Sequence, residues 1–337
     1  MRTQVRERVA MITAYESCKV CRCHAAIMAT MDAFLRSLEK AELHVHLEGS
    51  ITPETLLELE PSLTREEVLS RYHYADFGGF LDAYKWVNQF LRRPEDYALI
   101  TRRLLAALAA QGVCYAEVIV SVGVMLWRNQ EFAPNFAAIE EAARKGPLPV
   151  RFIFDATRQF GVEQAWKVAQ YAAASRERGV LGFGIGGDEA RAPARIFHEV
   201  FAFARKAGLF ILPHAGEAAG PESIWQALEG GAARIGHGIR AIDDPVLVGH
   251  LRDHRIPLDI SISSNIRTGV VGSLGAHPVR RLYDAGVPVT LNTDDPPMFH
   301  TTLLNEYRIA HGVFGFGRDD LRQIAANSLE FALGLPR

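Results

Sequence analysis

The sequence is poor in cysteine, with four in 337 residues. Four are too few for a disulfide framework in a chain of this length. Three of them, Cys18, Cys21 and Cys23, lie together near the N-terminus, a grouping compatible with a structural zinc or a redox role. The surrounding segment shows no clear hydrophobic period, which favours a loosely attached, poorly ordered lead-in. We therefore expect an N-terminal extension over residues 1–37 and a single domain over residues 38–337.

A concentration of positive charge is also missing. The 37 Lys and Arg residues nearly balance the 39 Asp and Glu residues, and the net charge is -2. No segment gathers the basic residues that nucleic-acid or membrane-surface partners usually need. No apolar run reaches the roughly 18 to 20 residues that span a bilayer, and the N-terminus lacks the hydrophobic stretch of a signal peptide. The composition predicts a soluble, cytoplasmic protein, and the sequence leaves its oligomeric state open.

Apolar runs rich in Val, Ile and Phe recur along the chain, each followed by a longer stretch with helical spacing. Eight runs are predicted as strands, at Glu42–His46, Tyr115–Ser121, Val150–Ala156, Leu181–Gly186, Phe210–His214, Arg234–His237, Pro257–Ser261 and Pro288–Asp294. Helices are predicted between them, for example at Pro94–Gln111, Val162–Arg178, Ala192–Ala207, Glu222–Glu229, Pro245–Asp253 and His277–Ala285. This repetition predicts an α/β fold, the (β/α)8 TIM barrel. Residues 52–93 exceed a normal crossover and predict an extended loop-helix insertion after the first strand, which shapes or covers a pocket.

Two histidines end the first predicted strand. Side chains at i and i+2 of a strand project to the same face, so both rings can reach one metal ion. Another histidine and an aspartate follow later strands, and parallel barrels collect their working residues from the C-terminal ends of several strands. Three neutral imidazoles and a carboxylate suit Zn²⁺, whose open position would hold a water with a pKa near 7. We expect one zinc ion per chain on His44, His46, His214 and Asp294.

Acid–base groups stand near these predicted ligands. Glu217 lies three residues after the third histidine, and we predict it as the proton donor; an ordinary acidic residue favoured by a helix dipole is the alternative. His237 stands between two glycines that let a ligand approach closely, and it is predicted as a base or as an orienter of the attacking water. Asp294 and Asp295 cannot both face one metal from a regular strand. One is expected to bind the metal and the other the substrate, unless both only mark a turn.

Five motifs, in this order, resemble those of the adenosine deaminase family: His44-Val45-His46-Leu47-Glu48-Gly49, Gly186-Gly187-Asp188-Glu189, His214-Ala215-Gly216-Glu217, Gly236-His237-Gly238 and Thr293-Asp294-Asp295-Pro296. The match spans about Lys40 to Pro336. The resemblance implies a purine-metabolism hydrolase that acts on a C–N bond of a cyclic amidine. It would remove the 6-amino group of adenosine or a 5′-modified adenosine and leave an inosine-type product and ammonia.

The resemblance also implies roles around the purine ring. Zinc would bind the four ligands named above. Glu217 would protonate ring nitrogen N1, which makes C6 electrophilic, and His237 would orient the attacking hydroxide. Asp295 would hold N7, and the backbone amide of Gly187 would meet N3.

Five further positions bear on the substrate. The insertion resembles the family's apolar lid, with Phe80, Leu81 and Tyr84 about one helical turn apart, although these side chains equally suit core packing. Glu48 stands where the best-known adenosine deaminases have an aspartate that meets the ribose 5′-hydroxyl. Members that act on free adenine or on 6-aminodeoxyfutalosine also tend to have glutamate there. Arg267 is predicted either to pair with a substrate carboxylate, which the last of these would present, or to be a solvated surface residue.

Several alternatives stay open. Within the family, the chain suits an adenine deaminase or a 6-aminodeoxyfutalosine deaminase of menaquinone biosynthesis. A hydrolase of the same barrel type acting on another amide, amidine or ester is compatible with a metal and an acid alone. A non-catalytic purine-binding protein would be expected to lack Glu217, His237 or a metal ligand, and the sequence has all of them.

Overall fold

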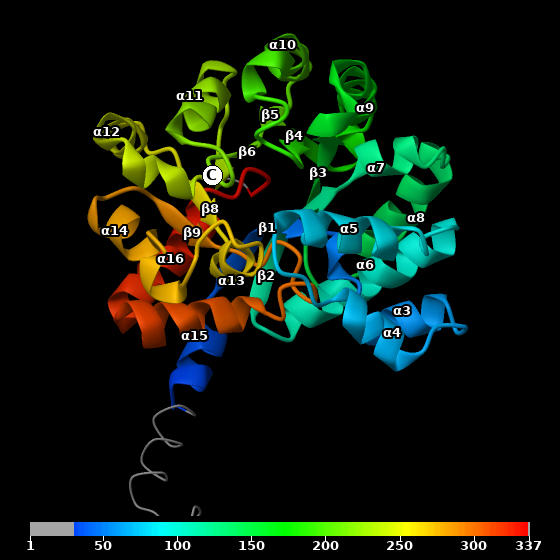
Figure 1. Ribbon diagram of the computed structural model, residues 1–337, viewed down its shortest axis with the longest axis horizontal. Coiled ribbons are helices and arrows are strands. Elements are labelled where there is room, and N and C mark those ends of the chain that lie inside the picture. Colours follow the sequence, from blue (N-terminus) through cyan, green and yellow to red (C-terminus); the bar gives the residue numbers. More distant parts are fainter. Residues whose placement is uncertain (1–29, 336–337) are drawn as a thin grey trace, which may run out of the picture. The chain divides into compact units, whose positions relative to one another are not determined.

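Short parallel strands, each followed by helices, build the domain in the computed structural model, which describes residues 30–335 (Figure 1). The strands are β1 Lys40–His46, β2 Val113–Val120, β3 Val150–Thr157, β4 Val180–Gly186, β5 Phe210–Ile211, β6 His214–Ala215, β7 Ile235–His237, β8 Leu258–Ile260 and β9 Val289–Leu291. Residues 30–37 are helical and belong to a separate unit, Met1–Leu38, so they are not placed relative to the domain. The predictions for Cys18, Cys21 and Cys23 lie outside the described residues.

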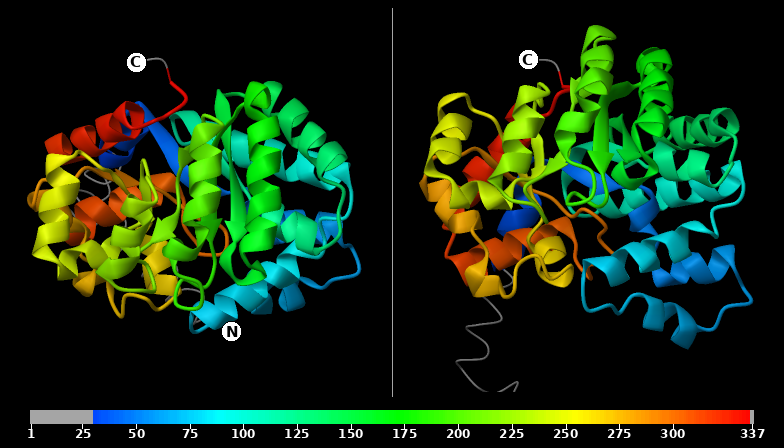
Figure 2. Two further views of the ribbon diagram at one scale, coloured as in Figure 1. Left: turned by 90° about the horizontal axis from the view of Figure 1, so that it is seen from above. Right: turned by 45° about the horizontal axis from the view of Figure 1, so that its top comes forward.

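The strands form two sheets that join into a barrel. One sheet has the order β1-β2-β3-β4-β5 and the other β6-β7-β8-β9. Val45 of β1 bridges to Asp294 beyond β9, and the His46 amide donates to the Asp294 carbonyl at 2.8 Å. Ile211 of β5 bridges to Ala232, just before β7. Helices surround the strands on the outside (Figure 2), and the predicted TIM-type barrel is confirmed.

The fifth predicted strand, Phe210–His214, is interrupted in the structure. Residues 212 and 213 separate β5 from β6. Pro213 has no amide hydrogen and therefore cannot donate to a neighbouring strand. Its carbonyl still accepts from the Gly236 amide at 3.0 Å, and the Leu212 amide still donates to the Phe183 carbonyl at 3.0 Å. The proline thus divides the strand without opening the barrel.

The helices lie at the predicted places, with shorter bounds in four cases. They are α3 Pro53–Leu59, α4 Arg65–Arg71, α5 Phe77–Asn88, α6 Pro94–Ala109, α7 Val122–Trp127, α8 Phe132–Arg144, α9 Val162–Ala174, α10 His198–Lys206, α11 Pro221–Glu229, α12 Pro245–Asp253, α13 Ile262–Arg267, α14 Val279–Asp284, α15 Leu303–Phe314 and α16 Arg318–Glu330. The prediction for Val162–Arg178 was too long because the chain tightens into a 3-10 turn after Ala174. The predicted helix Ala192–Ala207 also begins as a 3-10 turn, and Pro278 delays the start of α14.

Three helices, α3 to α5, make up the insertion between β1 and α6. Polar side chains cap each one at its N-terminus: Thr52 accepts from the Thr55 amide at 3.1 Å, and Asp76 accepts from the Gly79 amide at 2.8 Å. Such caps satisfy amides that the first helical turn leaves unpaired. The insertion is therefore an ordered helical segment, as expected, and α5 lies over the open end of the barrel strands (Figure 1).

A buried ion network fills the opposite end of the barrel. Arg234, 1% exposed, lies 2.7 Å from Glu117 of β2 and 2.5 Å from Asp259 of β8. The Leu333 amide donates to Glu117 at 2.6 Å, and the Leu333 side chain packs against apolar residues of β2, β3 and the β5–β6 segment. The last described residues therefore close the base of the barrel over these charges.

Replacing Arg234 with leucine should lower the free energy of unfolding by about 3–5 kcal/mol, because Glu117 and Asp259 would stay buried without their cation. Urea-induced unfolding measures the change. Arg255→Leu is the control, since Arg255 is exposed and pairs with Glu330 at the surface, where an ion pair contributes at most about 1 kcal/mol. Equal stabilities of the two variants would contradict the prediction.

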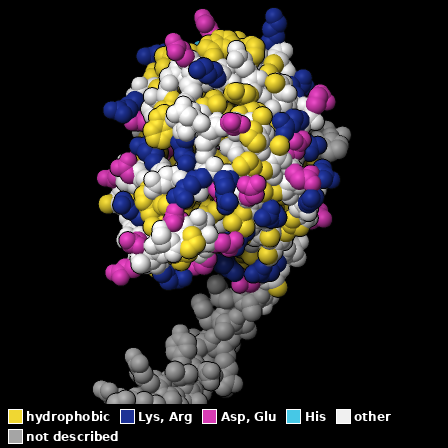
Figure 3. Space-filling model, turned by 90° about the vertical axis from the view of Figure 1, so that its right-hand side faces the viewer, with side chains coloured by type: hydrophobic (Ala, Val, Ile, Leu, Met, Phe, Trp, Pro, Cys, Tyr) yellow, Lys and Arg dark blue, Asp and Glu magenta, His cyan; other side chains and the backbone are white. Residues whose placement is uncertain are grey.

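The described surface carries both signs of charge. On the face shown in Figure 3, Lys and Arg side chains are interspersed with Asp and Glu side chains and with apolar residues. Within residues 30–335, no helix combines the length and apolar character needed to cross a bilayer.

Candidate active site

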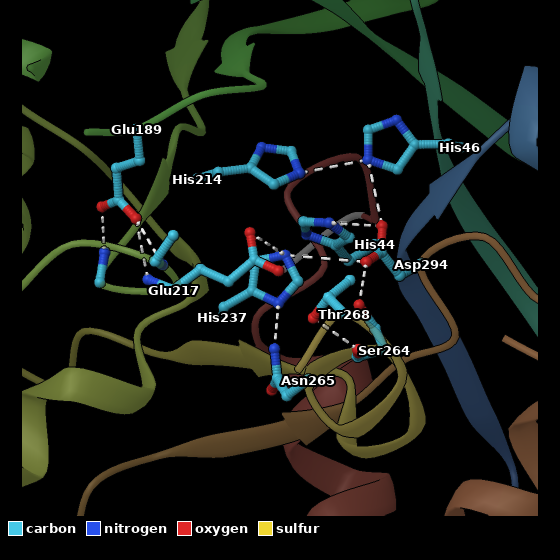
Figure 4. Close-up of polar contacts among 12 residues, drawn as sticks. His44, His46, Glu189, His214, Glu217, His237, Ser264, Asn265, Thr268 and Asp294 are labelled. Carbon is cyan, nitrogen blue, oxygen red and sulfur yellow. Dashed lines mark hydrogen bonds and ion pairs between the residues drawn. The ribbon is translucent and has the colours of Figure 1, made fainter. Parts of the chain in front are cut away.

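The four predicted metal ligands converge at the C-terminal edge of the barrel (Figure 4). His44 and His46 come from β1, His214 from β6, and Asp294 follows β9. His46 Nε2 lies 3.2 Å from His214 Nε2 and 3.3 Å from Asp294 Oδ1. His44 Nε2 lies 3.6 Å from the same aspartate oxygen. Strands that are far apart in the sequence thus present their donor atoms to one point.

The three measured separations suit ligands of one zinc ion. The donor atoms that lie within 4.8 Å of one another form two groups that share Asp294: His44, His214, His237 and Asp294 in one, and His46, Asp294 and Asp295 in the other. Zn–N and Zn–O bonds of about 2.0–2.1 Å place neighbouring ligand atoms about 3.3 Å apart. Nε2 of His44 is buried and has no hydrogen-bond partner among the described residues, as a lone pair reserved for a cation would. The structure therefore contains a buried His/Asp metal-binding cluster.

The protonation states of the predicted ligands also suit metal binding. Burial lowers the pKa of His46 to about 3 and, together with the neighbouring imidazoles, holds the pKa of His214 well below its usual value. Burial alone would raise the pKa of Asp294, but the imidazoles of His44, His46 and His237 around its carboxylate keep that pKa well below normal. Neutral imidazoles and an ionised carboxylate are the forms that bind metals.

Two site residues adopt unusual backbone conformations. His237 has φ of 62° and Asp294 has φ of 61°, in the left-handed region that non-glycine residues seldom occupy. Asp294 Oδ2 accepts a hydrogen bond from Ser264 at 2.7 Å, so its other oxygen faces the histidines. Strained conformations of this kind persist where the surrounding structure enforces them, typically at functional sites.

Glu217 is held in place by a second carboxylate. The backbone amides of residues 216–219 all donate to Glu189, at 2.5, 3.1, 2.9 and 2.9 Å. Although burial would raise the pKa of Glu189, the nearby Ser223 hydroxyl, these amides and the charge of Arg158 lower it, so Glu189 is an anion. The turn that carries Glu217 is therefore fixed by a residue from the β4 loop.

Glu217 and Asp295 are buried acids near the metal cluster. Burial raises the pKa of Glu217 to about 7, despite the opposing effect of His237. Burial and the adjacent Asp294 raise the pKa of Asp295 well above normal, and Asp295 Oδ1 has no partner among the described residues. A Cβ at Gly49 would lie 1.4 Å from that oxygen, so only glycine leaves room for it. Both acids can hold a proton near neutral pH.

His237 lies between these groups. Its Nε2 is 3.7 Å from Glu217 Oε2 and 3.8 Å from Asp294 Oδ2. Its Nδ1 contacts the side-chain amide of Asn265 at 3.1 Å. One ring nitrogen therefore faces the site while the other is held from behind.

A cavity opens beside the metal cluster. Its lining includes most of the residues that sequence reasoning assigned to the substrate: Phe80, Leu81, Tyr84, Gly187 and Asp295, together with His46, His214, Glu217, His237 and Asp294. Phe80, Leu81 and Tyr84 project from α5, so this helix forms one wall. Gly187, which has φ of 91°, also lines the cavity.

Two predicted substrate residues are not brought to this cavity. Arg267 ends α13, is exposed, and is absent from the cavity lining. Glu48 is buried behind the wall, where both carboxylate oxygens accept from the Ser121 amide at 3.1 Å. Glu48 thus supports Ser121, and its direct contact with a substrate stays a prediction.

The structure adds residues that sequence reasoning gave no role. Asp155, at the end of β3, lines the cavity, and burial raises its pKa to about 8. Its Oδ1 has no partner among the described residues. Glu189 belongs to the motif Gly186-Gly187-Asp188-Glu189, but the sequence did not predict its hydrogen bonds to the turn that carries Glu217. Asp155 did have a signal, since it is a carboxylate that directly follows the apolar run Phe152–Phe154 of β3.

The sequence and the fold were compared with those of known proteins. A family model described as "Adenosine deaminase" matches residues 39–334. The chain is 40% identical to the aminodeoxyfutalosine deaminase of Streptomyces avermitilis over 314 residues, 89% of this chain and 88% of that protein. It is 39% identical to the adenine deaminase of Rhizobium rhizogenes over 304 residues, 88% of this chain and 94% of that protein. A solved amidohydrolase from Burkholderia ambifaria with bound Zn has a TM-score of 0.83 at 26% identity, covering 89% of this chain and 87% of that one.

Proposed function

Because the chain belongs to the adenosine deaminase family, we propose that it hydrolyses an adenosine-type nucleoside with one zinc ion on His44, His46, His214 and Asp294. Water and the 6-aminopurine would give the 6-oxopurine and ammonia. The observation that carries the proposal is the meeting of four donor atoms, 3.2–3.6 Å apart along the measured edges, beside buried acids and a cavity.

The residues around the cavity have the chemistry that this reaction needs. Bound zinc would supply Lewis acidity, which makes water reactive near neutral pH. Glu217, with its raised pKa, would hold a proton and give it to purine N1. Asp295, protonated for the same physical reason, would donate to N7, and the Gly187 amide would meet N3. Each group would then stabilise the negative charge that develops on the ring.

The cavity wall favours a nucleoside over a free base. Beyond the purine-side groups, it presents the hydroxyls of Ser121 and Tyr84, 2.8 Å apart, and the carboxyl group of Asp155. A buried polar atom without a partner, such as Asp155 Oδ1, is costly unless a ligand satisfies it. Ribose hydroxyls would do so, whereas adenine has none.

One cation stands at this cavity. Lys85 of α5 is the sole lysine or arginine among the lining residues in the described part of the chain, and it is exposed. It pairs with Asp82 at 3.3 Å on the same helix. A carboxylate on the 5′ side of the substrate, as in aminodeoxyfutalosine, would find its counter-charge in Lys85, where Arg267 was expected.

Ammonia release from a panel of nucleosides tests the function. The purified chain should show the highest kcat/KM with aminodeoxyfutalosine, a lower value with adenosine, deoxyadenosine or methylthioadenosine, and the lowest with adenine, with steps of about tenfold or more. A preference for adenine would favour the second candidate, an adenine deaminase, which the Rhizobium rhizogenes relative supports. Absence of ammonia from every compound would contradict deamination itself.

Lys85→Gln should lower kcat/KM for aminodeoxyfutalosine by about fivefold and leave the value for adenosine unchanged, since exposed ion pairs contribute up to about 1 kcal/mol. Steady-state kinetics with both substrates measures the split. Lys145→Gln is the matched control, because Lys145 is an exposed lysine paired with Glu141 away from the cavity. Equal losses for both substrates would exclude charge recognition by Lys85.

A further inference from the structure

A line of hydrogen bonds reaches His237 from outside the cavity. The Val279 amide donates to His277 Nδ1 at 3.2 Å. His277 Nε2 contacts Asn265 Oδ1 at 3.1 Å, and Asn265 Nδ2 contacts His237 Nδ1 at 3.1 Å. Asn265 is fully buried, and the two histidines are 1% and 4% exposed.

The bond from Val279 determines which atom donates and which accepts in each of the other bonds. A backbone amide can only donate, so Nδ1 of His277 must be an acceptor without a proton. His277 is neutral, because burial lowers its pKa to about 3, and its single proton therefore sits on Nε2. His277 Nε2–H therefore donates to Asn265 Oδ1, and the Asn265 amino group must then face His237. Nδ1 of His237 must then accept, and the proton of the neutral ring sits on Nε2.

On the basis of the deamination proposed above, we infer that His277 and Asn265 are positioning residues that hold His237 as an Nε2–H donor. Sequence reasoning left two roles for His237, base or orienter. A ring whose Nδ1 is engaged and whose Nε2 carries the proton has no free lone pair in the site, so it cannot act as a base. It donates toward the space between Glu217 and Asp294, where both carboxylates lie within 3.8 Å of Nε2.

The tautomer can be observed directly. Proton–nitrogen NMR of histidine-labelled, zinc-loaded protein without substrate distinguishes a protonated from a bare ring nitrogen, and the signals of His237 are identified by their loss in His237→Asn. We expect the proton of His237 on Nε2 and none on Nδ1. A proton on Nδ1 would overturn the inference. This result does not depend on which purine is turned over, so it separates failure of the inference from failure of the proposed function.

Asn265→Asp gives the sharpest variant, since a carboxylate of the same size can only accept. It should move a proton to Nδ1 of His237 and lower kcat by at least ~10²-fold, the scale of a misplaced acid–base group, with KM changed less than about threefold. Retention of wild-type kcat would contradict the inference.

A pair of variants at His277 completes the test. His277→Gln keeps a donor for Asn265 Oδ1 and should retain most of the activity that His277→Phe loses. An equal loss of activity in the two variants would show that His277 matters only for packing, and it would contradict the inference. His198→Gln is the control for histidine replacement elsewhere, because His198 of α10 bonds to the Gln226 carbonyl at 2.7 Å, outside the site. Zinc content and thermal unfolding are measured for every variant.

Discussion

Removal of the metal should abolish deamination, and addition of Zn²⁺ should restore it. Loss of the ion would remove several kcal/mol of transition-state stabilisation, which corresponds to a fall of about 10³-fold or more in kcat. The expected stoichiometry is one zinc per chain, because the two groups of donor atoms among the described residues share Asp294 and therefore make up one site. Metal analysis alongside ammonia release after chelator treatment measures both quantities.

Mg²⁺ is the control in this experiment. Three imidazole nitrogens suit zinc and are poor ligands for magnesium, which prefers oxygen. Magnesium should therefore leave the chelated protein inactive. Full activity in protein that contains less than about a tenth of an equivalent of divalent metal would refute the proposed zinc site.

Glu217→Gln should lower kcat by at least ~10²-fold with zinc content unchanged. The glutamine fills the same space but cannot give a proton to the purine ring. Glu222→Gln is a matched control, since Glu222 is an exposed carboxylate five residues further along and outside the cavity. Near-normal turnover of the Glu217 variant would remove this residue from the mechanism.

The pH profile gives a second measurement on the same variant. Burial raises the pKa of Glu217 from its ordinary value to about 7, so the carboxyl group keeps its proton through the acidic range and loses it above pH 7. Because the acid acts in its protonated form, kcat of the wild-type protein should decline above about pH 7. The residual activity of Glu217→Gln should lack that decline, and a decline that persisted in the variant would belong to another group.

The metal cluster could be predicted from the sequence because two simple rules act together. Residues two apart on a strand share a face, which brings His44 and His46 together, and parallel strands end at one edge, which adds His214 and Asp294. Both rules depend only on local period and fold class. The same rules failed at Pro213, where the missing amide hydrogen divides one strand into two.

Other parts of the site could not be predicted, because they depend on where loops return in space. Asn265 lies in the short helix α13 and His277 just before α14, and only the folded barrel brings both behind His237. The exposure of Arg267 and the place of Lys85 at the cavity likewise depend on how α13 and α5 pack. Local sequence patterns do not show which of these two cations lies at the cavity.

Closure of the barrel between β1 and the segment after β9 has a consequence for how the protein is made. The His46 amide donates to the Asp294 carbonyl. Two of the predicted metal ligands are therefore separated by about 250 residues of the chain. During translation, the ribosome must deliver nearly the whole domain before the ion can be captured, and such distant pairings form slowly. Zinc uptake by a nascent or refolding chain would therefore mark the last stage of folding.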